Sequence, residues 1–167
     1  MTAPATPPDP ISEAKRLWVA HGWDEAAEGM AMVTAIMRVQ QILLRRVDEV
    51  LRPFDLTFAR YEVLMLLSFS RTGAMPMKRV GSRLQVHPTS VTSAVDRLQA
   101  QGFVERRSHP TDRRAVLACI TDAGRAVASE ATTIMNREVF EQPGLSAGDV
   151  KQLSRILRIV RVQAGDS

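Results

Sequence analysis

The 167-residue chain contains a single cysteine, Cys119, and this excludes a framework of intramolecular disulfides. It also lacks an apolar run long enough to cross a membrane, so no membrane partner is predicted. Residues 1–10 are rich in proline, alanine and threonine and lack the charged-then-apolar pattern of a signal peptide. We therefore expect a disordered N-terminal tail on a protein of a reducing cytoplasm.

The motifs of common enzyme and metal sites are missing as well. The chain has no Gly-rich phosphate loop, zinc motif or Ser/His/Asp arrangement. Its three histidines, His21, His87 and His109, lack the spacing of metal ligands. The sequence thus predicts a protein that is not an enzyme and has neither a cofactor nor a metal.

What the chain does contain is a helix-turn-helix pattern. Met77–Leu84 is predicted as a short amphipathic helix, and a three-residue turn, 85–87, follows it. Pro88 suits the first position of a second helix, because its φ is already helical and its missing N–H is not needed there. That helix should end near Gln101, with a left-handed C-cap at Gly102. In such an arrangement the second helix can enter the major groove of DNA.

A β-hairpin is predicted directly after this pattern. Residues 103–107 and 114–120 read as its strands, and 108–113 as its turn. Residues 73–76, just before the helix-turn-helix, are expected to form a loop. The combination of a helix-turn-helix and a basic-tipped hairpin predicts a winged helix.

Positive charge is concentrated in the same region. The whole chain carries a formal charge of +4. Residues 71–125 hold ten Lys and Arg against four Asp and Glu, a net of +6, whereas the remainder holds twelve against fourteen, a net of −2. A surface that binds phosphates requires such a local excess of positive charge.

The flanking segments read as helices. Expected helices cover Ile11–His21, about Glu25–Leu51, and Phe58–Ser70 with Thr57 as its cap. After the hairpin, Thr121 should cap a helix to about Glu141, and Ser146 with Asp149 should begin the last one as a capping box. The long helix and the last helix carry more apolar residues than one small core can bury, which favours a partner. The predicted fold class is mainly α with a small β-wing.

Several motifs resemble the MarR family of bacterial transcription regulators. They are the run Ser90–Leu98, the step Gly102–Arg106 into the wing, the wing-tip Asp112–Arg114, and Ile120–Arg125, which fits the family's LT-x-x-G element with Ile in place of Leu. The similarity covers roughly residues 28–162, and the wing motif is its most specific part.

The resemblance implies a domain organisation and an activity. Residues 1–10 would be the tail, 11–52 and 121–167 would form dimerisation helices, and 53–120 would be the winged helix-turn-helix DNA-binding lobe. A two-fold homodimer places two recognition helices about one DNA turn apart, so the operator should be a near-palindrome. No segment of the sequence resembles a polymerase-recruiting domain, and this favours a repressor over an activator. The resemblance places such a repressor in the bacterial cytoplasm, associated with the nucleoid when it is bound to DNA.

Candidate DNA contacts follow from the residue types. Short polar residues at the start of the second helix can reach phosphates and base edges, whereas Val91, Ala94, Val95 and Leu98 should face the core. Thr89, Ser90 and Ser93 are the first choices for the groove; Thr92 is a weaker one, and the hydroxyl of Thr89 could instead cap the helix. The further candidates are Arg97, Arg106, Arg107, Lys78 and Arg79 for the DNA backbone, Asp112 for bracing the wing turn, and Arg113 or Arg114 for the minor groove.

Family members typically bind a small aromatic or phenolic anion between the dimerisation helices and the DNA-binding lobe. An acyl-CoA thioester is a second possible effector class. The tentative pocket residues are Trp18, His21, Trp23, Met37, Arg38, Tyr61, Met65 and Phe69. As an alternative, Met37, Met65 and Phe69 are ordinary core residues.

Two alternative functions stay open at the sequence level. Cys119 could make the regulator redox-responsive, and strand alternation places it opposite Ala118 and Ile120, so we expect it to be partly exposed. The winged helix could also serve as a protein-interaction module, although its basic character argues against this.

Overall fold

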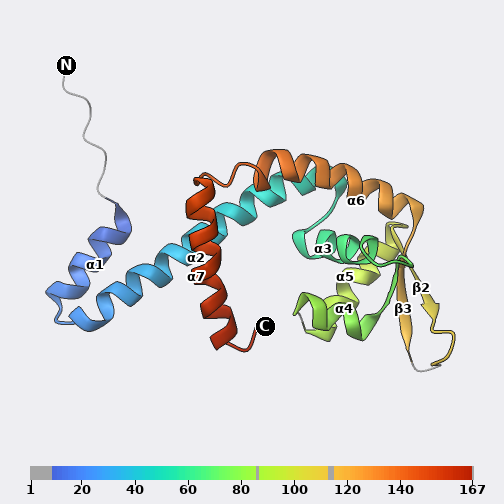
Figure 1. The fold of residues 1–167 in the computed structure, drawn as a ribbon, viewed down its shortest axis with the longest axis horizontal. Helices are drawn as coiled ribbons and strands as arrows, with labels where there is room; N and C mark the ends of the chain where they lie inside the picture. The colour runs from blue at the N-terminus through green and yellow to red at the C-terminus, as the bar shows by residue number, and fades with distance from the viewer. Residues whose placement is uncertain (1–8, 86, 113–114, 167) are drawn as a thin grey trace, which may run out of the picture. The chain divides into compact units, whose positions relative to one another are not determined.

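The computed structural model describes residues 9–85, 87–112 and 115–166 (Figure 1). The chain divides into two compact units, of which the first ends at Arg45 and the second begins at Arg46. The predicted wing-tip residues Arg113 and Arg114 lie outside the described residues.

The first unit is built from two helices. In α1 (Pro10–Ala20), Asp9 is the N-cap, and its carboxylate accepts hydrogen bonds from the backbone N–H groups of Ile11 (3.3 Å) and Ser12 (3.0 Å). The second helix, α2 (Asp24–Leu51), begins in this unit and continues into the next. Among the residues described in the first unit, only Ala27 is buried, so its apolar side chains have no core of their own.

The second unit carries the remaining elements. After the end of α2 it contains the 3-10 turn η1 (Arg52–Phe54) and the helices α3 (Phe58–Ser68), α4 (Met77–Leu84) and α5 (Pro88–Ala100). It also contains the strands β1 (Ala74–Pro76), β2 (Val104–Ser108) and β3 (Val116–Ile120). The chain then continues through α6 (Asp122–Met135), the π-helical turn η2 (Asn136–Phe140) and α7 (Ala147–Gln163).

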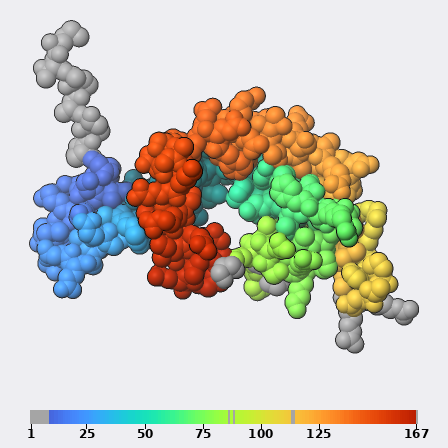
Figure 2. Space-filling model, in the orientation of Figure 1, coloured from blue at the N-terminus to red at the C-terminus, as the bar shows by residue number. Residues whose placement is uncertain are grey.

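The strands form an antiparallel sheet in the order β1-β3-β2. The hairpin register pairs Val104 with Ile120 and Ser108 with Val116. The expectation of a loop at residues 73–76 is wrong, because Ala74 pairs with Cys119 and Pro76 with Leu117. This strand is short and lies at the edge, where Pro76 is tolerated although it has no N–H to donate. Figure 2 shows the wing (yellow) standing out from the helices of this unit (green).

One hydrophobic core unites the second unit. Its members come from the end of α2, from Leu56 before α3, and from every later element between α3 and η2 except β1. The largest fully buried side chains are those of Leu51, Leu64, Leu67, Leu98, Met135, Val63, Val80, Val95 and Val104. Burial of such side chains is the main force that fixes α5 and the wing on the unit.

Local capping chemistry sets the ends of the helices. Thr57 caps α3, Thr121 caps α6 and Ser146 caps α7, each through a hydroxyl oxygen that accepts a hydrogen bond from a backbone N–H group of the first turn. At the end of α5, Gly102 adopts a φ of +75°, which only glycine reaches without strain. These ends were predicted, and the structure confirms them.

The helix predicted from Thr121 to about Glu141 changes character before its end. The α-helical part stops at Met135, and η2 continues as a π-helical turn in which the N–H of Glu141 donates to the carbonyl of Asn136 at 2.8 Å. The guanidinium of Arg46 donates to the carbonyls of Glu138 (2.6 Å) and Gln142 (3.0 Å). Arg46 thus supplies donors to carbonyls at and just beyond the end of η2, where helical N–H partners run out.

Large apolar side chains remain exposed on two helices. They are Met32, Val33, Ile36, Met37, Val39, Ile42, Leu43 and Leu44 on α2, and Leu153, Ile156, Leu157, Ile159, Val160 and Val162 on α7. An apolar surface of this extent is typical of a face that another chain covers. In the part of the chain that the structure describes, none of the helices has the length and apolar content needed to span a bilayer.

Candidate nucleic-acid interface

The start of α5 is organised by His87. Pro88 occupies the first turn of the helix as predicted, and His87 is the N-cap residue. The His87 Nδ1 atom accepts from the backbone N–H of Thr89 (3.3 Å) and lies 3.1 Å from the Thr89 hydroxyl oxygen. The capping role of His87 was not predicted from the sequence. The available signal was its position directly before a proline at the first helical position.

The two faces of α5 separate as the sequence predicted. Val91, Val95 and Leu98 are buried in the core, and Ala94 packs against it. The predicted groove residues lie on the other face and are exposed: Thr89, Ser90, Thr92, Ser93 and Arg97. The helix therefore presents short hydroxyl side chains near its N-terminal end, with a guanidinium one turn further on.

These side chains border a groove between α5 and the start of α3. It has a volume of about 800 Å³. From α5 it is lined by four of the predicted residues, Thr89, Ser90, Ser93 and Arg97. From the start of α3 it is lined by Thr57 and Arg60. The exposed hydroxyl and guanidinium groups on the α5 side of this groove can contact a nucleic-acid backbone, whereas the Arg60 side chain is only 15% exposed.

A second hollow lies where α4, α5 and the wing meet. Its volume is about 520 Å³, and it brings together four residues that were predicted as DNA contacts. These are Lys78 of α4, Thr92 of α5, Arg106 of β2 and Asp112 of the wing. The neighbouring Arg79 is exposed on α4.

Two of the predicted backbone contacts form ion pairs within the chain. Arg106 pairs with Asp96 of α5 and also donates to the side-chain oxygen of Gln99 at 3.2 Å. Arg107 pairs with Glu105 on the same strand. The Arg106 pair links the wing to α5, so Arg106 has a structural partner besides any phosphate that it contacts.

The turn of the wing is built around His109. Its Nδ1 atom accepts from the backbone N–H groups of Thr111 (3.3 Å) and Asp112 (3.2 Å). The carbonyl of Asp112 in turn accepts from the N–H of Ala115 at 3.0 Å. Asp112 thus lies inside the turn that it was expected to brace. The role of His109 was missed, because histidine has no characteristic position in such turns.

The tentative effector residues divide between the two units. In the first unit, the rings of Trp18 and Trp23 meet edge to face with centroids 5.0 Å apart, and His21 stacks on Trp23 at 5.5 Å. Met37 and Arg38 are exposed on α2 of the same unit. The ring stacking explains how the turn after α1 is held.

The other three effector candidates belong to the second unit. The Tyr61 hydroxyl lies 2.9 Å from the hydroxyl oxygen of Thr132, which also contacts the Met65 sulfur at 3.1 Å. A hollow of about 340 Å³ between α3 and α6 is lined by Met65 and Thr132, whereas Phe69 is 78% exposed. The view that Met37 and Phe69 are ordinary core residues is wrong for the single chain, because both side chains are largely exposed.

Cys119 is not partly exposed as strand alternation suggested, since only 6% of it is accessible. It lies on the central strand, paired with Ala74 on one side and Glu105 on the other, and the unexpected strand β1 completes this cover. Burial raises the pKa of the Cys119 thiol above its ordinary value; the Arg107 guanidinium opposes the shift and Glu105 adds to it. A raised pKa leaves less reactive thiolate at neutral pH.

Comparison with known proteins identifies the family. A model of the MarR family matches residues 54–115. The chain is 30% identical over 128 residues to the multiple antibiotic resistance protein MarR of Escherichia coli (strain K12), covering 75% of this chain and 87% of that protein. The chain belongs to the MarR family of transcription regulators.

Solved MarR family structures share the fold. The crystal structure of Sco5413, a MarR family transcriptional regulator from Streptomyces coelicolor, is 48% identical with a TM-score of 0.76, over 83% of this chain and 96% of that chain. A mutant of Escherichia coli MarR complexed with operator DNA is 27% identical with a TM-score of 0.73, over 82% of this chain and 98% of that chain. These MarR family matches confirm the predicted winged helix-turn-helix.

Proposed function

We propose that this chain is a homodimeric repressor that binds a near-palindromic operator and is released by a small-molecule effector. The observation that carries the proposal is the exposed face of α5, where Ser90, Ser93 and Arg97 line one groove. Lys78, Thr92 and Arg106 line a separate hollow beside the wing. The match to a family member that was crystallised with operator DNA supports the same reading. The protein would act on the nucleoid in the bacterial cytoplasm.

Homodimer formation is supported by the uncovered apolar faces. The exposed side chains on α2 and α7 belong to helices that the resemblance assigns to the dimer, residues 11–52 and 121–167. A stable interface commonly buries about 800 Å² on each partner and has an apolar centre. A second copy of the chain would cover both helices and repeat the DNA-binding face about a two-fold axis.

The roles on DNA differ by residue type. Ser90 and Ser93, with Thr89, would approach base edges in the major groove, whereas Arg97, Lys78 and Arg79 would contact phosphates. Thr92, Arg106 and Arg107 would border the same surface, and Asp112 would brace the wing. Arg113 or Arg114 would enter the minor groove, where a narrow A·T-rich segment attracts an arginine side chain.

The effector would be a small aromatic acid, a phenol or an acyl-CoA thioester. The candidates are the cluster Trp18, His21 and Trp23 with Met37 and Arg38 in one unit, and Tyr61, Met65 and Phe69 in the other. Aromatic and methionine side chains suit an adaptable apolar pocket, and an arginine can pair with a carboxylate. The buried state of Cys119 gives the redox alternative no support.

The test is selection of duplex DNA from a random pool by the purified full chain, followed by fluorescence anisotropy against the selected sequence and an unrelated duplex at two salt concentrations. We expect enrichment of a near-palindrome that binds at least 1,000-fold more tightly than the unrelated duplex, as specific regulators do. Phenolic acids and acyl-CoA thioesters are then added to the complex to find a compound that releases the DNA.

Equal, weak binding to both duplexes, lost at the higher salt, would contradict the proposal. The protein-interaction module would then be the better reading, because a basic surface alone produces only salt-sensitive, sequence-independent binding.

A further inference from the structure

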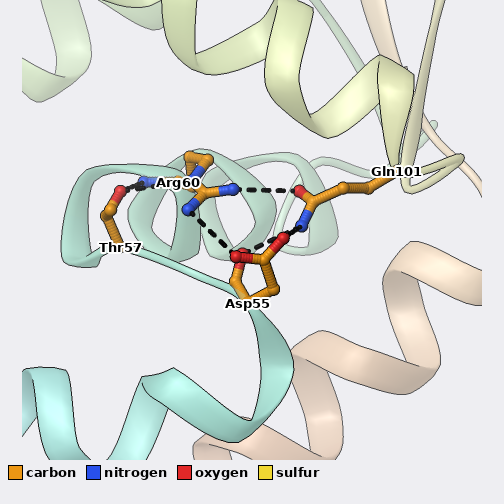
Figure 3. A network of polar contacts seen from close by, with 4 residues as sticks. All are labelled: Asp55, Thr57, Arg60 and Gln101. Atoms are coloured by element: carbon orange, nitrogen blue, oxygen red, sulfur yellow. Dashed lines mark hydrogen bonds and ion pairs between the residues drawn. The ribbon is translucent and has the colours of Figure 1, made fainter.

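A polar network joins the C-terminal end of α5 to the start of α3 (Figure 3). Gln101 follows the last residue of α5, and its Nε2 atom donates to the carbonyl oxygen (2.9 Å) and to the Oδ2 atom (3.0 Å) of Asp55. Its Oε1 atom accepts from Nη1 of Arg60 at 3.2 Å. One amide side chain is thus held from both of its ends.

The remaining contacts of the network join Arg60 to Thr57 and to Asp55. The Nε atom of Arg60 donates to the hydroxyl oxygen of Thr57 at 3.4 Å, and this oxygen is also the N-cap acceptor of α3. Nη2 of Arg60 lies 4.0 Å from Oδ1 of Asp55, and only 15% of the arginine side chain is exposed. Asp55 itself has a left-handed backbone, with a φ of 49°.

The network lines the same groove from the C-terminal end of α5, whereas the hydroxyl residues line it from nearer the N-terminal end. The helix has 13 residues, which makes it about 20 Å long. A rotation of about 5° at one end of a helix of this length moves the other end by about 1.7 Å. Recognition of base edges requires side chains to be held to within about 0.5 Å. A small change in tilt would therefore remove the contacts of Ser90 and Ser93.

We propose that Arg60 and Gln101 are positioning residues that fix the tilt of α5 and thereby determine how well the protein distinguishes its operator from other DNA. The inference rests on the proposed function, because it concerns the same surface. Affinity for unrelated DNA depends on charge near the phosphates and tolerates a shift of this size. Loss of the network should therefore reduce specific binding selectively.

The experiment compares Arg60→Met, Arg60→Lys, Gln101→Ala and the double variant Arg60→Met/Gln101→Ala with the wild type. Binding is measured on the selected operator duplex and on an unrelated duplex across a salt series. Each single variant should lose about tenfold in operator affinity, the scale of one charge-assisted hydrogen bond. Affinity for the unrelated duplex and the salt slope should stay within twofold of the wild type. The operator affinity of the double variant should be at most about twofold below that of either single variant, because the two residues act as a unit. Independent residues would instead multiply their losses to about 100-fold.

Arg60→Lys separates positioning from charge. A lysine keeps the positive charge but lacks the planar fork that reaches Thr57 and Gln101 together. It should therefore behave like Arg60→Met. Recovery of operator binding by Lys, with a salt slope that falls by about one in Arg60→Met, would show a direct phosphate contact and overturn the proposal.

Circular dichroism and thermal unfolding are recorded for every variant. If Arg60→Met fails to fold, Gln101→Ala decides the question alone, since it breaks the network while Arg60 stays in place. Wild-type-like discrimination by a folded Gln101→Ala variant would overturn the proposal. A wild-type protein that does not distinguish the two duplexes would instead contradict the proposed function.

Discussion

Single side chains on α5 should divide into those that read sequence and those that add affinity. Ser93 and Arg97 are both exposed and border the same groove. We expect Ser93→Ala to lower operator affinity by about 1 kcal/mol and to change the preferred base at one position, because a hydroxyl contact to a base edge is lost. Selection of DNA by the variant would show the changed base, and an unchanged preference would assign Ser93 to the phosphates.

Arg97→Ala is the matched comparison on the same face of α5. It should weaken binding to operator and unrelated duplex alike and reduce the salt slope by about one, as the loss of one phosphate contact does. Anisotropy titrations at four or more salt concentrations measure the slope. A loss confined to the operator would mean that Arg97 contacts a base.

The partly buried carboxyl group of Glu62 on α3 should make the stability of the fold depend on pH. Partial burial raises the pKa of Glu62 above its ordinary value of 4.5. The folded state therefore holds its proton at a pH where the unfolded state has lost it, and stability declines as the pH rises through that window. Glu62→Gln removes this effect. The variant should be more stable than the wild type at pH 7, and the difference should vanish near pH 4.

Chemical denaturation of both proteins at pH 4 and pH 7 provides the measurement for Glu62. Glu130→Gln is a suitable control, because Glu130 is exposed on α6. A gain that is equal at both pH values would show that burial of the charge is not its cause.

The sequence predicted the two faces of α5 but not the roles of its neighbours. Hydroxyl and apolar positions alternate with the helical period, so the burial of Val91, Val95 and Leu98 followed from spacing alone. The hydrogen bonds of His87 and His109 depend on ring geometry that spacing does not reveal. Cys119 was misjudged because strand β1, which covers its edge of the sheet, was not anticipated.

The first turn of α6 requires glycine at position 124, because the backbone of Phe103 passes close to it. A Cβ atom at this position would lie 2.1 Å from the carbonyl oxygen of Phe103, which accepts a hydrogen bond from the N–H of Thr121. Neither backbone can move without opening the junction between the wing and α6. We expect Gly124→Ala to lower the free energy of unfolding by about 2–4 kcal/mol.

Gly148→Ala is the control for that substitution. A Cβ atom at Gly148 would meet only the Ser146 hydroxyl oxygen at 3.7 Å, an ordinary contact, and alanine favours the helix. This variant should match or slightly exceed the wild type in urea denaturation. Similar stabilities for the two variants would mean that the close approach at Gly124 is relieved by a small shift.

The N-cap of α5 gives a prediction about the helix as a unit. His87→Ala removes the acceptor for the Thr89 N–H and should cost about 1 kcal/mol of stability, whereas His87→Asn supplies another good cap and should keep most of it. Thermal unfolding of the two variants measures the difference. Equal losses in both would assign the effect of His87 to something other than capping.

Helices with local signals were predictable, and elements that depend on distant partners were not. The caps Thr57, Thr121 and Ser146 act within one turn, so the sequence shows them directly. Strand β1 exists because the outer edge of β3 is available, and a three-residue segment carries no periodicity of its own. The π-helical turn η2 likewise occurs where Arg46, some 90 residues earlier in the chain, binds the carbonyl of Glu138.

Across the whole molecule, the excess positive charge and the exposed apolar side chains lie in different parts of the chain. The excess of positive charge falls on residues 71–125, whereas the exposed apolar faces fall on α2 and α7. This separation could be predicted from composition along the sequence. The sequence could not predict whether a side chain of α2 contacts a core or a partner chain. The period of a helix shows that one face is buried but not what buries it.

The dimer is tested by placing charge on α7. Ile156 and Val160 lie one helical turn apart and are both exposed in the single chain, so Ile156→Glu/Val160→Glu should leave the fold of the second unit intact. A charge buried at an interface without a partner strongly opposes association, so the variant should be a folded monomer in light scattering. Ser154→Glu, which adds a negative charge at a position that is already polar and exposed, should remain a dimer.

Loss of the dimer should also remove most operator binding. In the proposed dimer, each recognition helix would read one half-site, and joining two of them turns the second binding event into an intramolecular one, which can raise affinity by about 100- to 10,000-fold. The monomeric variant should therefore bind the full operator hardly better than an isolated half-site. Truncation after Gly144, which removes α7 altogether, should have the same effect, and a truncated chain that still dimerises would place the interface elsewhere.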